Sequence, residues 1–160
     1  MRKYIVHRPS PSAVSFPRQE LDVAILATVI LSSETPEFPI DNVFDHHAGP
    51  GGTRWVAAEC GEQIVTVAFD TPQLLQGILL EVEEREVERT QELTIALSAD
   101  AGQTYRELLR QEYTFSPAGA TFEHEEWTVP VQEVTHIRLW ITPDKGGHPC
   151  RATLTTLAFH

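Results

Sequence analysis

The stretch Leu93-Thr-Ile-Ala-Leu-Ser98, followed by Ala-Asp100-Ala-Gly102, decides the fold class of this 160-residue chain. Leu93, Ile95 and Leu97 alternate with small or polar residues, so the apolar side chains fall on one face of a strand. The serine, aspartate and glycine that follow are typical of a tight turn, with glycine where a positive φ is needed. A half-buried strand closed by a turn is the repeating unit of an antiparallel β-protein.

The same alternation recurs on both sides of this stretch. It predicts strands over residues 64–69, 78–83 and 136–141, each with apolar side chains on one face. Residues 105–115 also read as a strand, although Glu107–Glu112 alone would suit a helix. The spacing of turns, every 8–14 residues, favours the strand.

Other segments are less regular. Val23–Leu31 is a continuous apolar run, which predicts a strand buried on both faces, with a short helix as the alternative. Asp70-Thr-Pro72 is expected to end the strand that precedes it. Residues 126–131 form a short strand near an edge or a bulge, because Pro130 cannot donate a ladder hydrogen bond. A last strand is expected over residues 153–159.

These segments give about eight strands, and 38 residues are valine, isoleucine or threonine, which suit a pleated sheet. We therefore predict an all-β protein, an eight-stranded jelly-roll β-sandwich. Residues 1–20, rich in proline and serine, form an extended basic arm, and residues 21–160 form the sandwich domain. The loop over residues 34–54 is long enough to expect a functional role.

The formal charge of the chain is −11. The arm has a net charge of +3, so the remaining residues have a net charge of −14. Such an acidic surface repels phosphate backbones, and we expect no nucleic-acid partner. No apolar run approaches the length of a membrane span, and the N-terminus lacks the apolar core of a secretory signal. We therefore expect a cytoplasmic protein with no membrane partner. Cys60 and Cys150 exclude a disulfide framework; a cytoplasmic location favours free thiols, and a single bridge stays open.

Four short patterns in order resemble the discoidin, or coagulation-factor type C, domain, also called galactose-binding-like. Ser32-Ser33 follows the first strand, and Asn42-Val-Phe-Asp45 precedes Thr53-Arg-Trp55, which is similar to the family's Asp-Gly…Thr-x-Trp. Residues 93–105 resemble the family's Val-x-x-Ser-x-Asp-Gly strand and turn, and residues 134–139 resemble its Arg-Tyr-x-Arg-Leu strand. The resemblance implies an eight-stranded jelly roll that binds through loops at one end, with Trp55 packed in the core.

The resemblance also implies a site for a structural calcium ion. Asp45 and Thr53 match family ligands, but His46 follows Asp45 where the family has glycine, and Thr156 replaces the usual glutamate. Losing a bidentate carboxylate weakens a calcium site considerably, because calcium takes six to eight oxygens. We therefore expect no cofactor, and Asp45 and Thr53 as the ligands of a weak calcium site if one exists.

No nucleophile motif, phosphate-binding loop or paired acid and base is visible, so no enzyme activity is predicted. The candidate ligand-binding residues lie in three loop regions, over residues 42–54, 84–91 and 115–124. They are His46, His47, Arg85, Arg89, Phe122 and His124. Imidazole and guanidinium groups can hydrogen-bond sugar hydroxyls, and an aromatic ring offers a contact surface. The alternatives are solvated histidines, and arginines that only relieve repulsion among the glutamates of residues 81–88.

Two functions fit this sequence. The first is a non-catalytic module that binds a carbohydrate, or another neutral or cationic ligand, through loops at one end of the sandwich. The second is an intracellular protein–protein interaction adaptor, whose acidic surface would meet a basic partner. His46, Arg85 and Arg89 around one pocket would favour the first, and a flat apolar patch beside Trp140 would favour the second.

Overall fold

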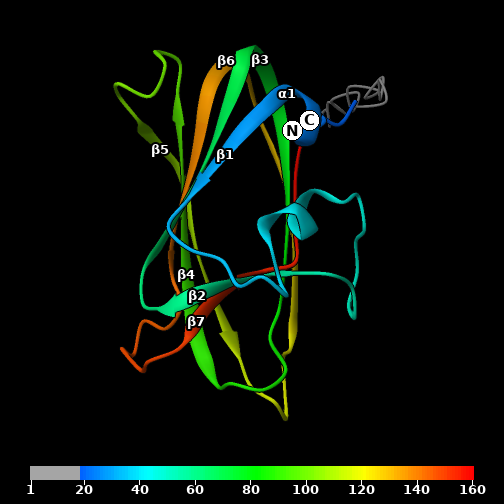
Figure 1. Cartoon of the computed structure of the whole chain (residues 1–160), viewed down its shortest axis with the longest axis vertical. Helices are drawn as coiled ribbons and strands as arrows, with labels where there is room; N and C mark the ends of the chain where they lie inside the picture. Colours follow the sequence, from blue (N-terminus) through cyan, green and yellow to red (C-terminus); the bar gives the residue numbers. More distant parts are fainter. Residues whose placement is uncertain (1–18) are drawn as a thin grey trace, which may run out of the picture.

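The computed structural model describes residues 19–160, so the arm expected over residues 1–20 lies almost wholly outside the described residues. The described chain contains two short helices and eight strands (Figure 1). They are α1 (Val23–Leu26), β1 (Ala27–Leu31), the 3-10 helix η1 (Ile40–Phe44), β2 (Trp55–Cys60), β3 (Gln63–Glu83), β4 (Arg89–Ser98), β5 (Arg106–Phe115), β6 (Phe122–Thr142), β7 (Arg151–Leu154) and β8 (Thr156–Phe159). No helix in this part of the chain is long and apolar enough to cross a bilayer.

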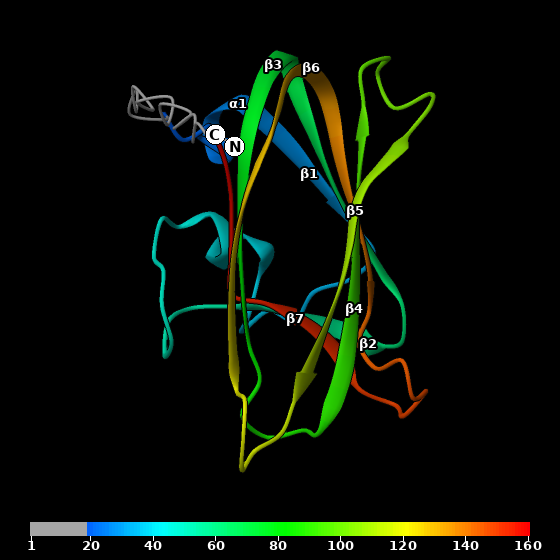
Figure 2. The ribbon, with the colours of Figure 1, turned by 180° about the vertical axis from the view of Figure 1, so that it is seen from behind.

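Two long antiparallel strands, β3 and β6, contribute to both layers of the sandwich. Each is 21 residues long, and both arch over the same end of the molecule (Figures 1 and 2). The first half of β3 and the second half of β6 lie in a five-stranded layer ordered β1-β3-β6-β4-β5. Their other halves pair with each other, and β8 adds to β3 at Ile78–Glu81. This architecture confirms the predicted jelly-roll β-sandwich.

The core lies between the two layers and follows the alternation in the sequence. Leu93, Ile95 and Leu97 are at most 1% exposed. The opposite layer contributes Ile78, Leu80, Val82, Leu157 and Phe159, which are equally buried. Burial of such side chains stabilises the fold by about 1.5–3 kcal/mol each. The arch is closed by an edge-to-face contact between Phe69 and Phe159, with ring centroids 6.4 Å apart.

A separate two-stranded ribbon, β2 and β7, covers the side of the sandwich near its lower end in Figure 1. Trp55 and Leu154 pair across it and point inward, fully buried. The Trp55 indole N–H donates to the Ser33 carbonyl oxygen at 3.2 Å, which satisfies its polar atom. Trp55 is therefore a core residue, as expected, and the outer face of the ribbon is left for other contacts.

Two sequence predictions about strand limits were wrong. Val23–Leu31 is not one strand buried on both faces: the first four residues form α1, and β1 is an edge strand that exposes Thr28 and Ile30. Asp70-Thr-Pro72 does not end a strand either. Strand β3 continues through it, and only its pairing with β6 is interrupted, between Ala68 and Gln73. The proline is tolerated because the chain bends there from one layer to the other.

Two further corrections concern the C-terminal half. The strands expected over residues 126–131 and 136–141 are parts of one strand, β6. Pro130 lies at an irregularity in its pairing, as predicted, because Gln132 pairs with Leu75 while Thr128 pairs with Gly77. The final strand expected over residues 153–159 is divided at Thr155 into β7 and β8. These two strands lie in different sheets, so the chain turns between them.

Candidate ligand-binding site

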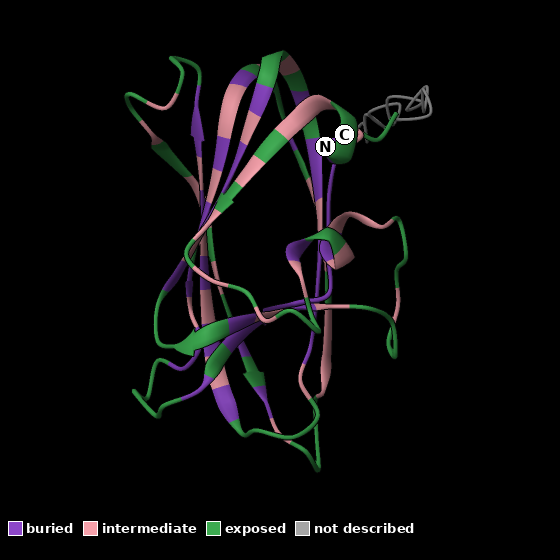
Figure 3. Cartoon of the chain, viewed as in Figure 1, coloured by how far each residue is buried: buried purple, intermediate pink, exposed green. Residues whose placement is uncertain are grey.

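Three loops meet at the lower end of the sandwich in Figure 1. They connect β3 to β4, β5 to β6 and β6 to β7, and the loop that precedes β2 lies beside them. The residues of these loops are mostly exposed, as are those of the β4–β5 loop at the opposite end, while the strands are buried in alternation (Figure 3). Several connections from different strands thus place exposed side chains close together at this end.

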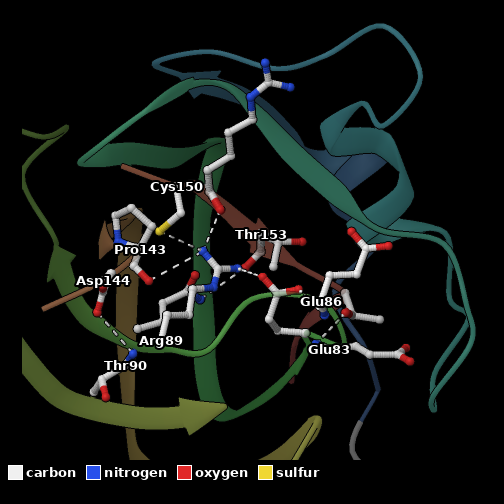
Figure 4. A network of polar contacts seen from close by, with 12 residues as sticks. Glu83, Glu86, Arg89, Thr90, Pro143, Asp144, Cys150 and Thr153 are labelled. Carbon is white, nitrogen blue, oxygen red and sulfur yellow. Dashed lines mark hydrogen bonds and ion pairs between the residues drawn. The ribbon is translucent and has the colours of Figure 1, made fainter. Parts of the chain in front are cut away.

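Arg89, at the start of β4, is buried beneath these loops (Figure 4). Its side chain is 1% exposed and forms an ion pair with Glu84 at 3.0 Å. It also donates to the carbonyl oxygens of Arg151, at 2.6 Å, and Pro143, at 3.4 Å, and to the Cys150 sulfur at 3.7 Å. Arg89 thus fastens the β3–β4 loop to β7 and to the β6–β7 loop, and its guanidinium is already engaged.

Asp144 organises the β6–β7 loop. Its carboxylate accepts the backbone N–H groups of Gly146, Thr90 and His148, at 3.0–3.3 Å, and the His148 ring lies 2.9 Å away. The N–H of Gly146 is the main reason why the pKa of Asp144 is lowered to about 2. The loop is therefore pre-formed around an ionised carboxylate.

Two grooves lie at this end and meet at Arg54. The loop groove, of about 640 Å³, is lined by Phe38 and by residues 47, 48 and 50–54. The ribbon groove, of about 290 Å³, lies between the β3–β4 loop and the outer face of the β2–β7 ribbon. Arg54 lines both, and its guanidinium lies 5.0 Å from the centre of the Phe38 ring.

The register of the ribbon determines what lines the ribbon groove. Val56 pairs with Thr153, Arg151 lies two residues before Thr153 on β7, and Arg54 directly precedes β2; all four residues line the ribbon groove. Among residues 19–160, neither Arg54 nor Arg151 forms an ion pair. The opposite wall is the exposed loop of Glu86 and Val87, and Val87 is 40% exposed.

The predicted ligand-binding residues are not brought into one pocket. His46 and Arg85 are exposed and each contacts a carboxylate: His46 lies 3.0 Å from Glu20, and Arg85 pairs with Glu83. His47 is exposed and lines the loop groove. The three residues whose convergence would favour a small ligand, His46, Arg85 and Arg89, do not share a groove.

The remaining candidates lie on the layer next to the loop groove. Phe122 is half-buried and pairs across the sheet with Glu83. His124 lies 2.9 Å from the buried carboxylate of Glu81. Burial alone would raise the pKa of Glu81, but the Gly49 N–H and the His124 ring outweigh it and hold the pKa below its ordinary value.

Asp45 and Thr53, the calcium ligands that the resemblance implies, contact each other directly. Thr53 donates its hydroxyl to the Asp45 carboxylate, and Thr156 donates to the carbonyl oxygen of His47 at 2.9 Å. The Asp45 carboxylate and the His47 carbonyl oxygen thus each accept a hydrogen bond from a threonine hydroxyl. Within the described residues, no cluster of three or more histidine, cysteine, aspartate or glutamate side chains is arranged to hold a metal. Both cysteines are free thiols.

Comparison with known proteins identifies solved structures that share this fold. No protein-family model matches the chain, and no curated protein matches it. Solved structures do match: a pectin binding carbohydrate binding module is 23% identical, with a TM-score of 0.61 over 84% of this chain and 90% of that one. CBM32-3 from a family 31 glycoside hydrolase of Clostridium perfringens is 16% identical, with a TM-score of 0.63 over 88% and 94%. The chain has the fold of family 32 carbohydrate-binding modules.

A further module with this fold is chitosan-binding module 1 from a chitosanase/glucanase of Paenibacillus sp. IK-5. It is 22% identical to this chain, with a TM-score of 0.61 over 88% of this chain and 98% of that one. The chain thus spans nearly the full length of these modules.

Arg54, Val56 and Arg151 line the ribbon groove but are not among the ligand-binding residues that the sequence predicts. Arg54 and Arg151 are far apart in the sequence, and only the pairing of β2 with β7 brings them to one face. The local sequence held a partial indication, because Arg54 and Val56 alternate with the buried residues Trp55 and Ala57.

Proposed function

We propose that this chain is a discoidin-like, non-catalytic carbohydrate-binding module whose ligand lies across the ribbon groove and the loop groove. One observation carries the proposal: Arg54 and Arg151, neither of them paired with a carboxylate among the described residues, flank the outer face of the ribbon at the loop end of the sandwich. The fold supports it, because solved structures that share it are modules described as binding pectin, chitosan or galactose.

The groove offers what sugar recognition needs. The guanidinium groups of Arg54 and Arg151 supply several N–H donors for hydroxyl oxygens, and the exposed carboxylate of Glu86 supplies an acceptor. Val87 gives an apolar contact for the C–H face of a sugar ring. The binding requires no covalent step. A chain of net charge −11 disfavours a polyanionic glycan, and two arginines without ion pairs disfavour a cationic one, so we expect a neutral glycan.

A glycan array, probed with and without calcium, tests this function. Calorimetry with the glycan that binds then compares the wild type with Arg54→Ala/Arg151→Ala. Loss of charged hydrogen-bond donors is expected to weaken binding at least tenfold, on the order of 1.5–3 kcal/mol per bond. Arg106→Ala is the control, because Arg106 is exposed, like Arg151, but lies at the start of β5, at the far end of the sandwich. Binding to no glycan, or unchanged affinity in the double variant, would overturn the proposal.

A protein-interaction role is the second candidate, and the outer face of the five-stranded layer supports it. Trp140 is 43% exposed there, pairs with Ile64 on β3, and lies on the same face as the exposed Ile30 of β1. An exposed aromatic with apolar neighbours is a common centre of protein interfaces. A partner retained by the wild type and lost by Trp140→Ala, together with a silent glycan array, would favour this role.

A further inference from the structure

The loop over residues 45–53 forms one wall of the loop groove, and its conformation needs an anchor. Gly49 and Gly51 have φ of +95° and +80°, a region that favours glycine. Glycines also lose more conformational freedom than other residues when a loop is fixed. Something must therefore hold this wall against the sandwich.

We propose that the buried carboxylates of Glu81 and Glu83 are positioning residues that hold this loop in place of a cation. Glu81 accepts the Gly49 N–H at 2.8 Å, and Glu83 accepts the Gly51 N–H at 2.7 Å. The inference that this anchoring shapes a binding groove rests on the proposed function, whereas the anchoring itself rests on geometry alone.

Burial makes these contacts specific. The side chains of Glu81 and Glu83 are 4% and 8% exposed, and both lie on β3, two residues apart and on the same face. Gly49 and Gly51 are also two residues apart, so two neighbouring hydrogen bonds connect the loop to the strand. Hydrogen bonds from N–H groups to a carboxylate are about twice as strong as neutral ones. A buried carboxylate left without them would be costly.

The other carboxylate oxygens of Glu81 and Glu83 also contact protein groups, so no ion is needed to satisfy them. The second oxygen of Glu81 contacts the His124 ring, and Arg85 pairs with Glu83. Thr156, which stands where a metal-ligating glutamate was expected, donates instead to the His47 carbonyl oxygen. A loop that presents N–H groups to carboxylates has the opposite polarity from one that presents carbonyl oxygens to calcium.

Residue-resolved amide hydrogen exchange by NMR tests the anchor. In the wild type the amides of Gly49 and Gly51 are expected to be protected. Glu81→Gln should accelerate exchange at Gly49 about tenfold or more, and Glu83→Gln should do so at Gly51, because each loses a charged acceptor. The amide of Leu93, in the core, reports global unfolding and should not change. Glu126→Gln, at an exposed position of β6, is the control.

A calcium titration of the unmodified chain provides a second test that does not depend on any variant. The melting temperature and the exchange rates of Gly49 and Gly51 are expected to be the same in millimolar calcium and in EDTA. Unprotected glycine amides in the wild type, or a rise in melting temperature with calcium, would overturn the inference. Neither readout uses a glycan, so failure to find a sugar ligand would count against the proposed function alone.

Discussion

At the scale of single residues, Arg89 connects parts of the chain that are distant in the sequence. Its guanidinium holds Glu84 of the preceding loop and carbonyl oxygens of the β6–β7 loop and β7. The glutamates of residues 81–88 favour two interpretations of Arg89: it binds a ligand, or it relieves the repulsion among these glutamates. Arg89 lies on the same strand face as the buried residues Gln91 and Leu93, and this spacing indicates that its side chain points inward.

Arg89→Ala should destabilise the protein strongly. The substitution leaves the carboxylate of Glu84 without its partner in a largely buried position, a change that typically costs about 3–5 kcal/mol. Urea unfolding followed by tryptophan fluorescence measures the loss. Arg85→Ala removes an exposed arginine four residues away, and the Glu83 carboxylate with which it pairs keeps the hydrogen bond from the Gly51 N–H, so the substitution should cost about 1 kcal/mol or less. Equal effects of the two substitutions would show that Arg89 does not hold the loops together.

Asp144 predicts how stability depends on pH. Its folded pKa of about 2 is below the ordinary value, so its contribution is full above the ordinary value and is lost as the pH falls towards 2. The free energy of unfolding should therefore drop between about pH 4 and pH 2 less steeply in Asp144→Asn than in the wild type. Asp70→Asn, at an exposed position, should keep the wild-type slope. Identical slopes for Asp144→Asn and the wild type would contradict the assignment.

At the scale of secondary-structure elements, β3 and β6 show what sequence patterns can and cannot predict. The alternation of Leu93, Ile95 and Leu97 in β4 predicted one buried face correctly, because burial acts locally along each strand. Pro72 predicts a strand end, which is wrong, whereas Pro130 predicts an edge or a bulge, and an irregularity is present there. Both lie within long strands, because a strand that passes from one layer to the other needs irregular pairing at the bend.

The β4–β5 hairpin depends on a glycine. Gly102 has φ of +80°, and a Cβ there would lie 3.2 Å from both the His136 ring and the Tyr105 hydroxyl. Gly102→Ala should therefore destabilise the fold by about 1–2 kcal/mol or more, through backbone strain and crowding. Gly119→Ala, in the β5–β6 loop, meets no atom closer than 3.6 Å and should change stability by less than about 0.5 kcal/mol. Thermal unfolding compares the two, and a neutral Gly102→Ala would contradict the required turn.

At the scale of the whole molecule, the sequence predicts the fold but not the residues of the proposed binding surface. Alternation, turn spacing and the discoidin-like patterns are all local in sequence, so they predicted the sandwich. Arg54 and Arg151 meet only because β2 pairs with β7, a contact between segments about a hundred residues apart. Long-range pairing of this kind leaves no trace in either segment alone, whereas the position of Trp55 in the core could be inferred from the resemblance.

We propose that the loop end of this sandwich binds a carbohydrate and neither cleaves nor modifies it. An amide NMR titration with the best glycan from the array, followed by mass spectrometry of the recovered glycan, tests it most directly. We expect chemical-shift changes concentrated at Arg54, at Glu86–Val87 and at Arg151, and a glycan of unchanged mass. Shifts confined to the Trp140 face, or a cleaved or modified glycan, would contradict it.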